Sequence, residues 1–289
     1  MYKYIDISTY QKNVDYLSVK NDGVKGVILR VGHTGYGNQS MYKDVEFERH
    51  YAGFTKVGVP VGVYWFSRAN TKALALKEAQ LTLEFIKGKN IQLPVYFDTE
   101  DTYYQAKISK QALTEVALTY LNKIKEAGYV AGVYASVSWL NNRLDMNKLQ
   151  QFETWVAQYF TRCTYTKPYQ MWQYSSSGRV KGISGNVDMN WAYKPYHELP
   201  IEKPIEVKPI PTKKYLNLSK LVTSWNVYPL NKDARVGNQI GKLAPKRFGG
   251  LKYEILEVLP NNVYVIETKS FGKVKIWAGK GALFTITSS

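Results

Sequence analysis

The alternation of short apolar runs with longer amphipathic segments constrains the fold of this chain more than any other feature of the sequence. Three segments, 44–58, 71–89 and 109–129, repeat their apolar residues with the 3.6-residue period of a helix. The last of them opens at Ser109, a favoured helix-capping residue, and ends at Gly128. Between and around these segments lie eight apolar runs with the β-branched and aromatic composition of strands. The runs are YKYIDI (2–7), KGVILRV (25–31), VGVYWF (61–66), LPVYF (93–97), VAGVYA (130–135), TWVAQY (154–159), QMWQY (170–174) and NVDMNW (186–191).

About eight strands alternating with helices over residues 1–196 predict an α/β fold in the form of a (β/α) barrel. A doubly wound open sheet is the main alternative. The links between the runs after residue 150 are too short for full helices. We therefore expect an irregular barrel with a reduced set of outer helices.

The rest of the chain differs in character. The Pro-rich stretch around residues 197–213 has neither helical nor strand periodicity, which predicts an extended linker. Residues 214–289 predict a small all-β barrel made of short strands. The strands are SWNVYPL (224–230), KYEILEV (252–258), VYVIETKS (263–270) and KVKIWAG (273–279), and the turn signal PNNV (260–263) lies between two of them.

Acidic side chains occur at the strand ends where a β/α barrel carries its active site. Asp6 ends the first run, and Asp188 lies in the last. Asp98 and Glu100 follow the fourth run two residues apart, about 6.6 Å along an extended chain, so both point to the same face. Asp101 points the other way, and we expect it to be a loop charge.

Repulsion between neighbouring carboxylates, together with burial, favours one protonated and one ionised group near neutral pH. Glycoside hydrolysis needs this division, with an acid to protonate the leaving oxygen and an anion to stabilise positive charge at the anomeric carbon. A solvated strand end is the alternative for an isolated DTE (98–100). Acids at the ends of other strands favour the catalytic interpretation.

Other kinds of site are disfavoured. The three histidines, His33, His50 and His197, do not pair at zinc spacing, and we expect neither a metal nor another cofactor. The net charge of +16 attracts polyanions such as nucleic acid, an anionic membrane or an acidic cell wall. Scattered lysines without a recognition motif argue against nucleic acid, and no apolar run is long enough for membrane insertion.

Aromatic residues near the strand ends also indicate sugar binding, because aromatic rings stack on the C–H faces of sugars. Strand alternation directs about half of these side chains inward, and ordinary core packing is the alternative for each. The candidate substrate contacts are Tyr64, Trp65, Phe66, Tyr134, Trp172 and Tyr174.

Four ordered motifs carry a resemblance to a known family. IDISTYQ (5–11) matches an opening Asp-x-Ser-x-x-Gln, and residues 42–66 match a Tyr-x-Asp-x-x-Phe helix followed by a Gly-x-Tyr-x-Phe strand. VYFDTE (95–100) carries Asp-x-Glu, and residues 172–192 match a closing Trp-Gln-Tyr segment with Val-Asp-x-Asn. Residues 1–196 thereby resemble glycoside hydrolase family 25, the lysozymes of the Chalaropsis type. Trp65 departs from the pattern, since many members have His there.

The resemblance implies cleavage of the β-1,4 bond from N-acetylmuramic acid to N-acetylglucosamine in peptidoglycan. It makes Glu100 the proton donor and Asp98 the stabilising carboxylate, with Asp6 and Asp188 completing an acidic cleft. It leaves open whether an Asp attacks the sugar or the substrate's own 2-acetamido group does so; we favour the latter, with net retention. A catalytically inactive wall-binding protein is disfavoured, because all four acids are intact.

Residues 215–289 resemble a bacterial Src-homology-3-like cell-wall-binding domain of the kind attached to phage lysins of lactic acid bacteria. The candidate ligand contacts are Trp225, Tyr228, Tyr253 and Trp277. Residues 213–289 carry thirteen basic and four acidic side chains, which favours the anionic polymers of Gram-positive walls as partners.

A lysozyme with a wall-binding tail, whose N-terminus MYKYIDIS (1–8) lacks the features of a signal peptide, resembles a phage or prophage endolysin. The resemblance implies synthesis in the host cytoplasm, release through holin pores, and action at the cell wall. A bacterial autolysin with the same chemistry is the alternative.

Overall fold

The computed structural model describes residues 1–196 and 214–288, so the predicted linker at 197–213 lies outside the described residues. The chain divides into two compact units, Met1–Val207 and Lys208–Ser289. Among the described residues, no helix combines the length and apolar character needed to cross a membrane.

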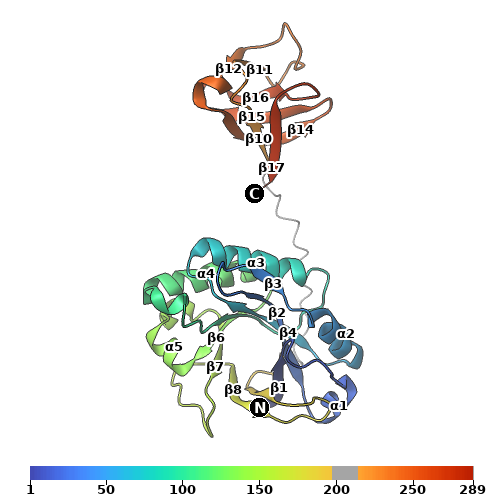
Figure 1. Ribbon diagram of the computed structural model, residues 1–289, viewed down its shortest axis with the longest axis vertical. Coiled ribbons are helices and arrows are strands. Elements are labelled where there is room, and N and C mark those ends of the chain that lie inside the picture. Colours follow the sequence, from blue (N-terminus) through green and yellow to red (C-terminus); the bar gives the residue numbers. More distant parts are fainter. Residues whose placement is uncertain (197–213, 289) are drawn as a thin grey trace. The chain divides into compact units, whose positions relative to one another are not determined.

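Eight strands of the first unit close into a barrel (Figure 1). In order around the ring they are β1 (Tyr2–Ile7), β2 (Gly26–Thr34), β4 (Val61–Ser67), β5 (Val95–Thr99), β6 (Ala131–Ser136), β7 (Glu153–Ala157), β8 (Met171–Gly178) and β9 (Val187–Ala192). Parallel pairing of β1 with β2 closes the ring, so the doubly wound open sheet is wrong. Strand β9 is antiparallel to both of its neighbours. The short strand β3 (Met41–Lys43), which the sequence did not predict, pairs with β2 outside the ring.

Helices cover the outer side of part of this barrel (Figure 1). They are α1 (Tyr16–Asn21), α2 (Phe47–Val57), α3 (Lys72–Phe85), α4 (Lys110–Glu126), α5 (Val137–Asn142) and α6 (Met146–Leu149), with a 3₁₀ turn, η1, at Gln105–Lys107. The described residues between β7 and β9 contain no helix. The prediction of an irregular barrel with reduced outer helices is therefore confirmed.

Helix α4 illustrates how local sequence sets these elements. The Ser109 side chain accepts a hydrogen bond from the Ala112 N–H, which caps the helix start. The helix ends where Gly128 adopts φ +84°, a left-handed conformation that glycine takes without strain. Its apolar face packs against α3, β5 and β6, with Tyr120 and Leu121 fully buried. Each such side chain contributes about 1.5–3 kcal/mol of burial free energy.

Large side chains fill the inside of the barrel, as in other barrels of this size. Tyr4, Ile28, Tyr96 and Trp155 are all buried there in one cluster. The centroid of the Trp155 ring lies 5.0 Å from the ring centroid of Tyr96 and 4.4 Å from that of Tyr134. This aromatic layer closes the barrel from within, so any cleft at the mouth has a solid floor.

Within residues 214–288, the second unit consists of strands and one 3₁₀ turn, η3, at Pro245–Phe248. The strands are β10 (Lys214–Leu218), β11 (Trp225–Val227), β12 (Gly241–Leu243), β13 (Leu251–Glu254), β14 (Glu257–Leu259), β15 (Val263–Thr268), β16 (Gly272–Trp277) and β17 (Phe284–Ser288). They form three small sheets, β13-β10-β17, β11-β12 and β14-β15-β16. Asn261 and Asn262 both have φ near +60° and turn the chain from β14 into β15, as PNNV predicted.

Candidate active site

A cleft of about 480 Å³ lies at the carboxyl ends of the barrel strands and brings together all four predicted acids. It is lined by Asp6, Ile7, Ser8, Thr9, Tyr10, Gln11, Arg30, His33, Tyr64, Phe66, Arg68, Asp98, Glu100, Tyr134, Trp155, Tyr159, Gln173 and Asp188. The acids come from β1, from the end of β5 and from β9, so the closure of the ring is what collects them.

Asp98 lies in the middle of a row that crosses three strands, with Phe66 of β4 on one side and Tyr134 of β6 on the other. Its side chain is buried, and its Oδ1 atom has no hydrogen-bond partner within the protein. Burial, followed by the charges of Glu100 and Asp6, holds the pKa of Asp98 well above its usual value. A buried, unpartnered acceptor of this kind is open to a donor on a ligand.

Glu100 is the first residue after β5 and is only partly buried. Burial, followed by the charge of Asp188, raises the pKa of Glu100. Since Glu100 and Asp98 both line the cleft, the predicted same-face geometry of the two carboxyl groups is found in the structure. A partly exposed acid that retains its proton is suited to proton donation.

Asp6 and Asp188 face one another across the antiparallel pair of β1 and β9. Burial and the charge of Asp188 hold the pKa of Asp6 well above its usual value, and burial also raises the pKa of Asp188. Two amides oppose this effect at Asp6, whose Oδ2 accepts hydrogen bonds from Gln173 Nε2 at 2.9 Å and Asn190 Nδ2 at 2.8 Å.

The orientation of both amides is fixed by groups behind them. Tyr134 and Tyr159 donate their hydroxyl protons to Gln173 Oε1, at 2.8 and 3.0 Å. The Trp155 indole N–H, which can only donate, binds Asn190 Oδ1 at 2.8 Å. With their oxygens engaged in this way, both amides must present N–H groups to Asp6.

Two arginines add positive charge at the edge of the cleft. Arg30 Nε binds Asp44 Oδ2 at 2.7 Å, and Arg68 Nε binds Asp101 Oδ2 at 2.9 Å. Asp101 is therefore more than the expected loop charge, since it is buried and its Oδ1 also accepts the backbone N–H of Tyr103 at 3.1 Å. This carboxylate fixes the turn that follows Glu100.

Three of the six predicted aromatic contacts line the cleft, namely Tyr64, Phe66 and Tyr134. The prediction for Trp65 is wrong, because strand alternation directs it to the outer side of β4. There it is fully buried, stacks on Phe85 and donates its indole N–H to Thr34 Oγ1 at 3.1 Å.

Trp172 and Tyr174 also do not line the cleft, since the residue between them in β8, Gln173, points inward instead. The Trp172 indole N–H donates to the Gln158 carbonyl oxygen at 2.8 Å, and Tyr174 stacks on Trp191. The predictions for Trp172 and Tyr174 are therefore wrong, because side chains alternate between the two faces of a strand and Gln173 takes the inner one.

The predicted ligand contacts of the second unit also divide into residues of the core and residues that a ligand can reach. Trp225 and Tyr228 are buried, and the Trp225 indole N–H donates to the Trp277 carbonyl oxygen at 2.8 Å, so these two residues belong to the core. Tyr253 is partly buried against the same core. The Trp277 side chain is 40% exposed and remains accessible to a ligand.

Several residues that line the cleft or hold its acids in place were not predicted from the sequence. Arg30 carried a signal, because a lone arginine inside the apolar run KGVILRV is unusual unless it is paired. Asn190 carried one too, since it lies two residues after Asp188 and must share its face. Gln173 stood in the Trp-Gln-Tyr motif, but its contact with Asp6 joins strands that are distant in sequence. The contact of Arg68 with Asp101 likewise joins two loops. Neither contact had a local signal.

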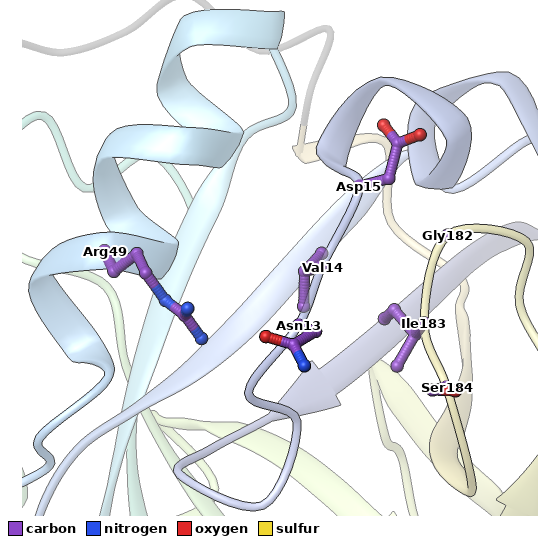
Figure 2. A pocket seen from close by; sticks show the side chains of 7 residues that line it. All are labelled: Asn13, Val14, Asp15, Arg49, Gly182, Ile183 and Ser184. Carbon is purple, nitrogen blue, oxygen red and sulfur yellow. The ribbon is translucent and has the colours of Figure 1, made fainter.

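A second hollow of about 650 Å³ lies between α2 and the loop that joins β8 to β9 (Figure 2). It is lined by Asn13, Val14, Asp15, Arg49, Gly182, Ile183 and Ser184. Although it is larger than the cleft, its charged groups are already engaged. Asp15 caps α1 through the Ser18 N–H at 3.1 Å, and Arg49 Nε binds Glu46 at 2.7 Å. We therefore place the chemistry in the acid-lined cleft.

In the part of the chain that the structure describes, no group of three or more His, Cys, Asp or Glu side chains is arranged to hold a metal ion. The cleft instead combines a partly exposed acid, a buried carboxyl group and aromatic walls at the mouth of a barrel. This arrangement is the one that acid-assisted glycoside cleavage requires.

The fold and this site place the chain among the glycoside hydrolases. The family model of the glycosyl hydrolases family 25 matches residues 5–183, more than half of the sequence, and the chain belongs to this family. The resemblance read from the four motifs is thus confirmed at the level of the family.

Individual relatives agree with this placement. An autolytic lysozyme of Clostridium acetobutylicum is 28% identical over 189 residues, 65% of this chain and 55% of that protein, so the chain spans little more than half of its length. The CTP1L endolysin structure has a TM-score of 0.58 at 26% identity and covers 68% of both chains. The modular autolysin LytC of Streptococcus pneumoniae, solved with a synthetic peptidoglycan ligand, has a TM-score of 0.58 at 30% identity, over 65% of this chain and 46% of its own.

Proposed function

We propose that the protein is a lysozyme, an N-acetylmuramidase that cleaves the β-1,4 bond between N-acetylmuramic acid and N-acetylglucosamine in peptidoglycan. One observation carries the proposal: the unpartnered, buried Asp98 carboxyl group shares a cleft with the partly exposed Glu100 two residues further on. The autolytic lysozyme, the endolysin and the peptidoglycan-bound autolysin among the relatives support the choice of substrate.

In the proposed mechanism, Glu100 carries the proton and Asp98 is the ionised member of the pair, because the charges of Arg30 and Arg68 oppose the rise in the pKa of Asp98. Glu100 gives its proton to the glycosidic oxygen as the bond to C1 breaks. The carbonyl oxygen of the substrate's 2-acetamido group attacks C1 and forms a cyclic oxazolinium ion, with Asp98 Oδ1 accepting the acetamido N–H and balancing its charge. Water then attacks C1 and gives a proton to Glu100. The acid is regenerated, and the configuration at C1 is retained.

The raised pKa of Glu100 gives this cycle its pH dependence. Because burial and Asp188 keep the carboxyl group protonated to higher pH than a free glutamate, the proton donor is available closer to neutral pH. The amides on Asp6 hold that side of the cleft in one arrangement while the substrate changes charge.

The test is mass spectrometry of the fragments that the full chain releases from purified Gram-positive peptidoglycan, beside Glu100→Gln. We expect reducing N-acetylmuramic acid ends from the wild type and a loss of several orders of magnitude for the variant. Glu84→Gln, which changes an exposed glutamate on α3, is the matched control and should release fragments normally. Reducing N-acetylglucosamine ends, free peptides or no fragments from the wild type would contradict the proposal.

We further propose that the second unit is a Src-homology-3-like domain that binds anionic wall polymers of Gram-positive bacteria. Its excess of basic residues supports this, as does a hollow of about 410 Å³ whose lining includes Lys273, Lys275 and Leu256. Exposed Trp277 lies on the same strand as the two lysines. Cosedimentation of the full chain with walls, before and after removal of teichoic acids, tests this, and binding that is unchanged by their removal would contradict it.

The proposed biological role is that of a phage or prophage endolysin, made in the host cytoplasm and released through holin pores to act on the wall. The likeness to the CTP1L endolysin supports this role, and the autolytic lysozyme supports a bacterial autolysin as the alternative. Expression in a Gram-positive host with and without a co-expressed holin separates the two. Lysis that does not need the holin would favour the autolysin.

A further inference from the structure

Three tyrosines gather on the surface just outside the acid-lined cleft. The ring centroids of Tyr36 and Tyr103 are 4.6 Å apart, and those of Tyr103 and Tyr104 are 4.8 Å apart. Tyr36 is 62% exposed and Tyr103 is 43% exposed, so neither ring serves the hydrophobic core. We name these three residues the tyrosine cluster.

The tyrosine cluster lies on the same end of the barrel as the acids. Tyr36 belongs to the loop that follows β2, and Tyr103 and Tyr104 belong to the loop that follows β5. Because β2 and β5 both pair in parallel with β4, which lies between them, the two loops leave the barrel at the same end. Glu100 begins the second loop, and Tyr103 is three residues further on, at most about 11 Å away along the chain.

Arg68 connects the tyrosine cluster to the cleft. This residue follows β4 and lines the cleft itself. Its guanidinium group donates to the Thr34 carbonyl oxygen at the start of the first loop and binds Asp101 in the second. Gln39 Nε2 in turn donates to the Arg68 carbonyl oxygen at 2.7 Å. The cluster and the catalytic end of β5 are thus parts of one bonded surface.

The two loops are also held to one another. The Tyr104 hydroxyl group donates to the Gly37 carbonyl oxygen at 2.6 Å, and Asp101 Oδ1 accepts the Tyr103 N–H. The loops that carry the exposed rings are therefore held in place before any ligand arrives, which lowers the entropy cost of binding to them. Exposed aromatic rings that are held rigidly are typical of binding surfaces.

We propose that the tyrosine cluster is a distal subsite for the glycan strand, on which a sugar ring beyond the cleft stacks against Tyr36 and Tyr103. Phenol rings offer flat apolar faces to the C–H groups of a pyranose, and their hydroxyl groups can bond to its oxygens. Lys107 Nζ lies 3.9 Å from the centroid of the Tyr103 ring and adds a cation for a carboxylate of the wall polymer. This inference rests on the proposed function, because it takes its ligand to be the strand that the cleft cuts.

The subsite predicts a dependence of cleavage on strand length. A short strand occupies the cleft alone, whereas a long one also reaches the tyrosine cluster and gains affinity there. The experiment measures kcat/KM of the full chain for peptide-free peptidoglycan glycans, as a purified tetrasaccharide and as strands of many repeats. Tyr36→Ala/Tyr103→Ala should lower kcat/KM about tenfold for long strands and change it less than about twofold for the tetrasaccharide, since tenfold equals about 1.4 kcal/mol.

A second tyrosine pair at the other end of the barrel provides the matched control. Tyr169 and Tyr193 lie with ring centroids 5.4 Å apart, and Tyr193 is 40% exposed. They lie before β8 and after the antiparallel β9, away from the catalytic end. Tyr169→Ala/Tyr193→Ala should cleave both substrates like the wild type. Tyr36→Phe/Tyr103→Phe keeps the stacking faces and should retain most of the long-strand advantage.

The outcomes separate this inference from the proposed function. Wild-type protein that cleaves neither substrate would refute the proposed muramidase itself. Wild-type cleavage with no loss in Tyr36→Ala/Tyr103→Ala on long strands would refute the subsite alone. An equal loss on both substrates would also refute it, since that result would mean that the cluster only supports the position of Glu100.

Discussion

The two units of this chain use their aromatic and charged residues in opposite ways. In the barrel, acids at the strand ends are wholly or partly buried around a cleft, and burial raises the pKa of each. In the second unit, the aromatic residues Trp225 and Tyr228 are part of the core, and its many lysines lie largely on the surface. A unit of about 75 residues has too small a core to bury functional groups as well as hydrophobic ones, so the wall polymer proposed as its ligand would bind on the outside.

This difference predicts that substitutions act differently in the two units. In the cleft, side chains are buried for chemistry and are in part unfavourable for stability, so replacing them costs activity more than folding. In the second unit, the buried aromatics serve stability, and the proposed wall binding would depend on exposed groups.

After Glu100→Gln, the largest effect is expected from Asp98→Asn. We expect kcat to fall by about 10³-fold, or about 4 kcal/mol, because the neutral amide no longer balances the positive charge that develops beside C1. The thermal midpoint should stay at or above that of the wild type, since the substitution removes a buried carboxyl group that Glu100 and Asp6 repel. Kinetics on soluble glycan and thermal unfolding measure the two quantities. A large drop in the midpoint would mean that Asp98 is a structural residue instead.

The second unit should show the reverse pattern at its own tryptophans. Trp225→Ala should lower the free energy of unfolding of this unit by about 3 kcal/mol or more, because it removes a buried ring and its hydrogen bond to the Trp277 carbonyl oxygen. Trp277→Ala should change that free energy by less than about 1 kcal/mol and weaken binding to purified walls. Denaturant unfolding and wall cosedimentation separate the two. Equal losses of stability would remove the distinction between core and surface.

A buried carboxyl group outside the cleft gives the barrel a pH-dependent stability. Glu78 on α3 accepts hydrogen bonds from Thr34 Oγ1 at 2.5 Å and Ser67 Oγ at 2.6 Å, and burial raises its pKa to about 7. Since the folded state binds this proton more tightly than the unfolded state does, the stabilisation is complete below the unfolded pKa, about 4.5. It is lost as the pH rises to about 7, by up to about 3 kcal/mol.

Glu78→Gln tests this dependence, because the amide stays neutral at every pH. Relative to the wild type, the variant should gain up to about 3 kcal/mol in unfolding free energy between pH 5 and pH 8. Glu84→Gln, on the exposed side of the same helix, should follow the wild type across that range. Urea unfolding at a series of pH values measures the difference in unfolding free energy between the variant and the wild type. If that difference stayed the same from pH 5 to pH 8, Glu78 would already be ionised in the folded state.

The barrel was predictable from sequence because its signals are local. The apolar runs and the helices at 44–58, 71–89 and 109–129 follow from periodicity, and the four acids follow from their place at strand ends. Trp65 was misplaced because a run of three aromatic residues does not reveal which of them points inward. The three-residue strand β3 is too short to carry a period at all.

What could not be predicted depends on pairing between distant segments. Gln173 holds Asp6 from 167 residues away, and Asn190 does so from 184 residues away. The tyrosine cluster joins two loops that are distant in sequence, since Tyr104 in one loop lies 67 residues after Gly37 in the other. In the second unit, β10 pairs with β17 across the whole unit, and the sequence predicted neither strand. No local pattern encodes such contacts, so the site became complete only in three dimensions.

The smallest effect is expected from separating the two units. A chain that ends at residue 196 should fold and cleave soluble glycan within about twofold of the full chain, because every residue of the cleft lies before that point. On intact walls at low enzyme concentration its rate should fall about tenfold, since it loses the effective concentration that a second binding unit provides. A chain that ends at residue 213 keeps the predicted linker and is the matched control; it should behave like the shorter one. If either chain failed to fold, the units would not be independent, and the contrast between an enclosed site and an exposed one would belong to a single cooperative structure.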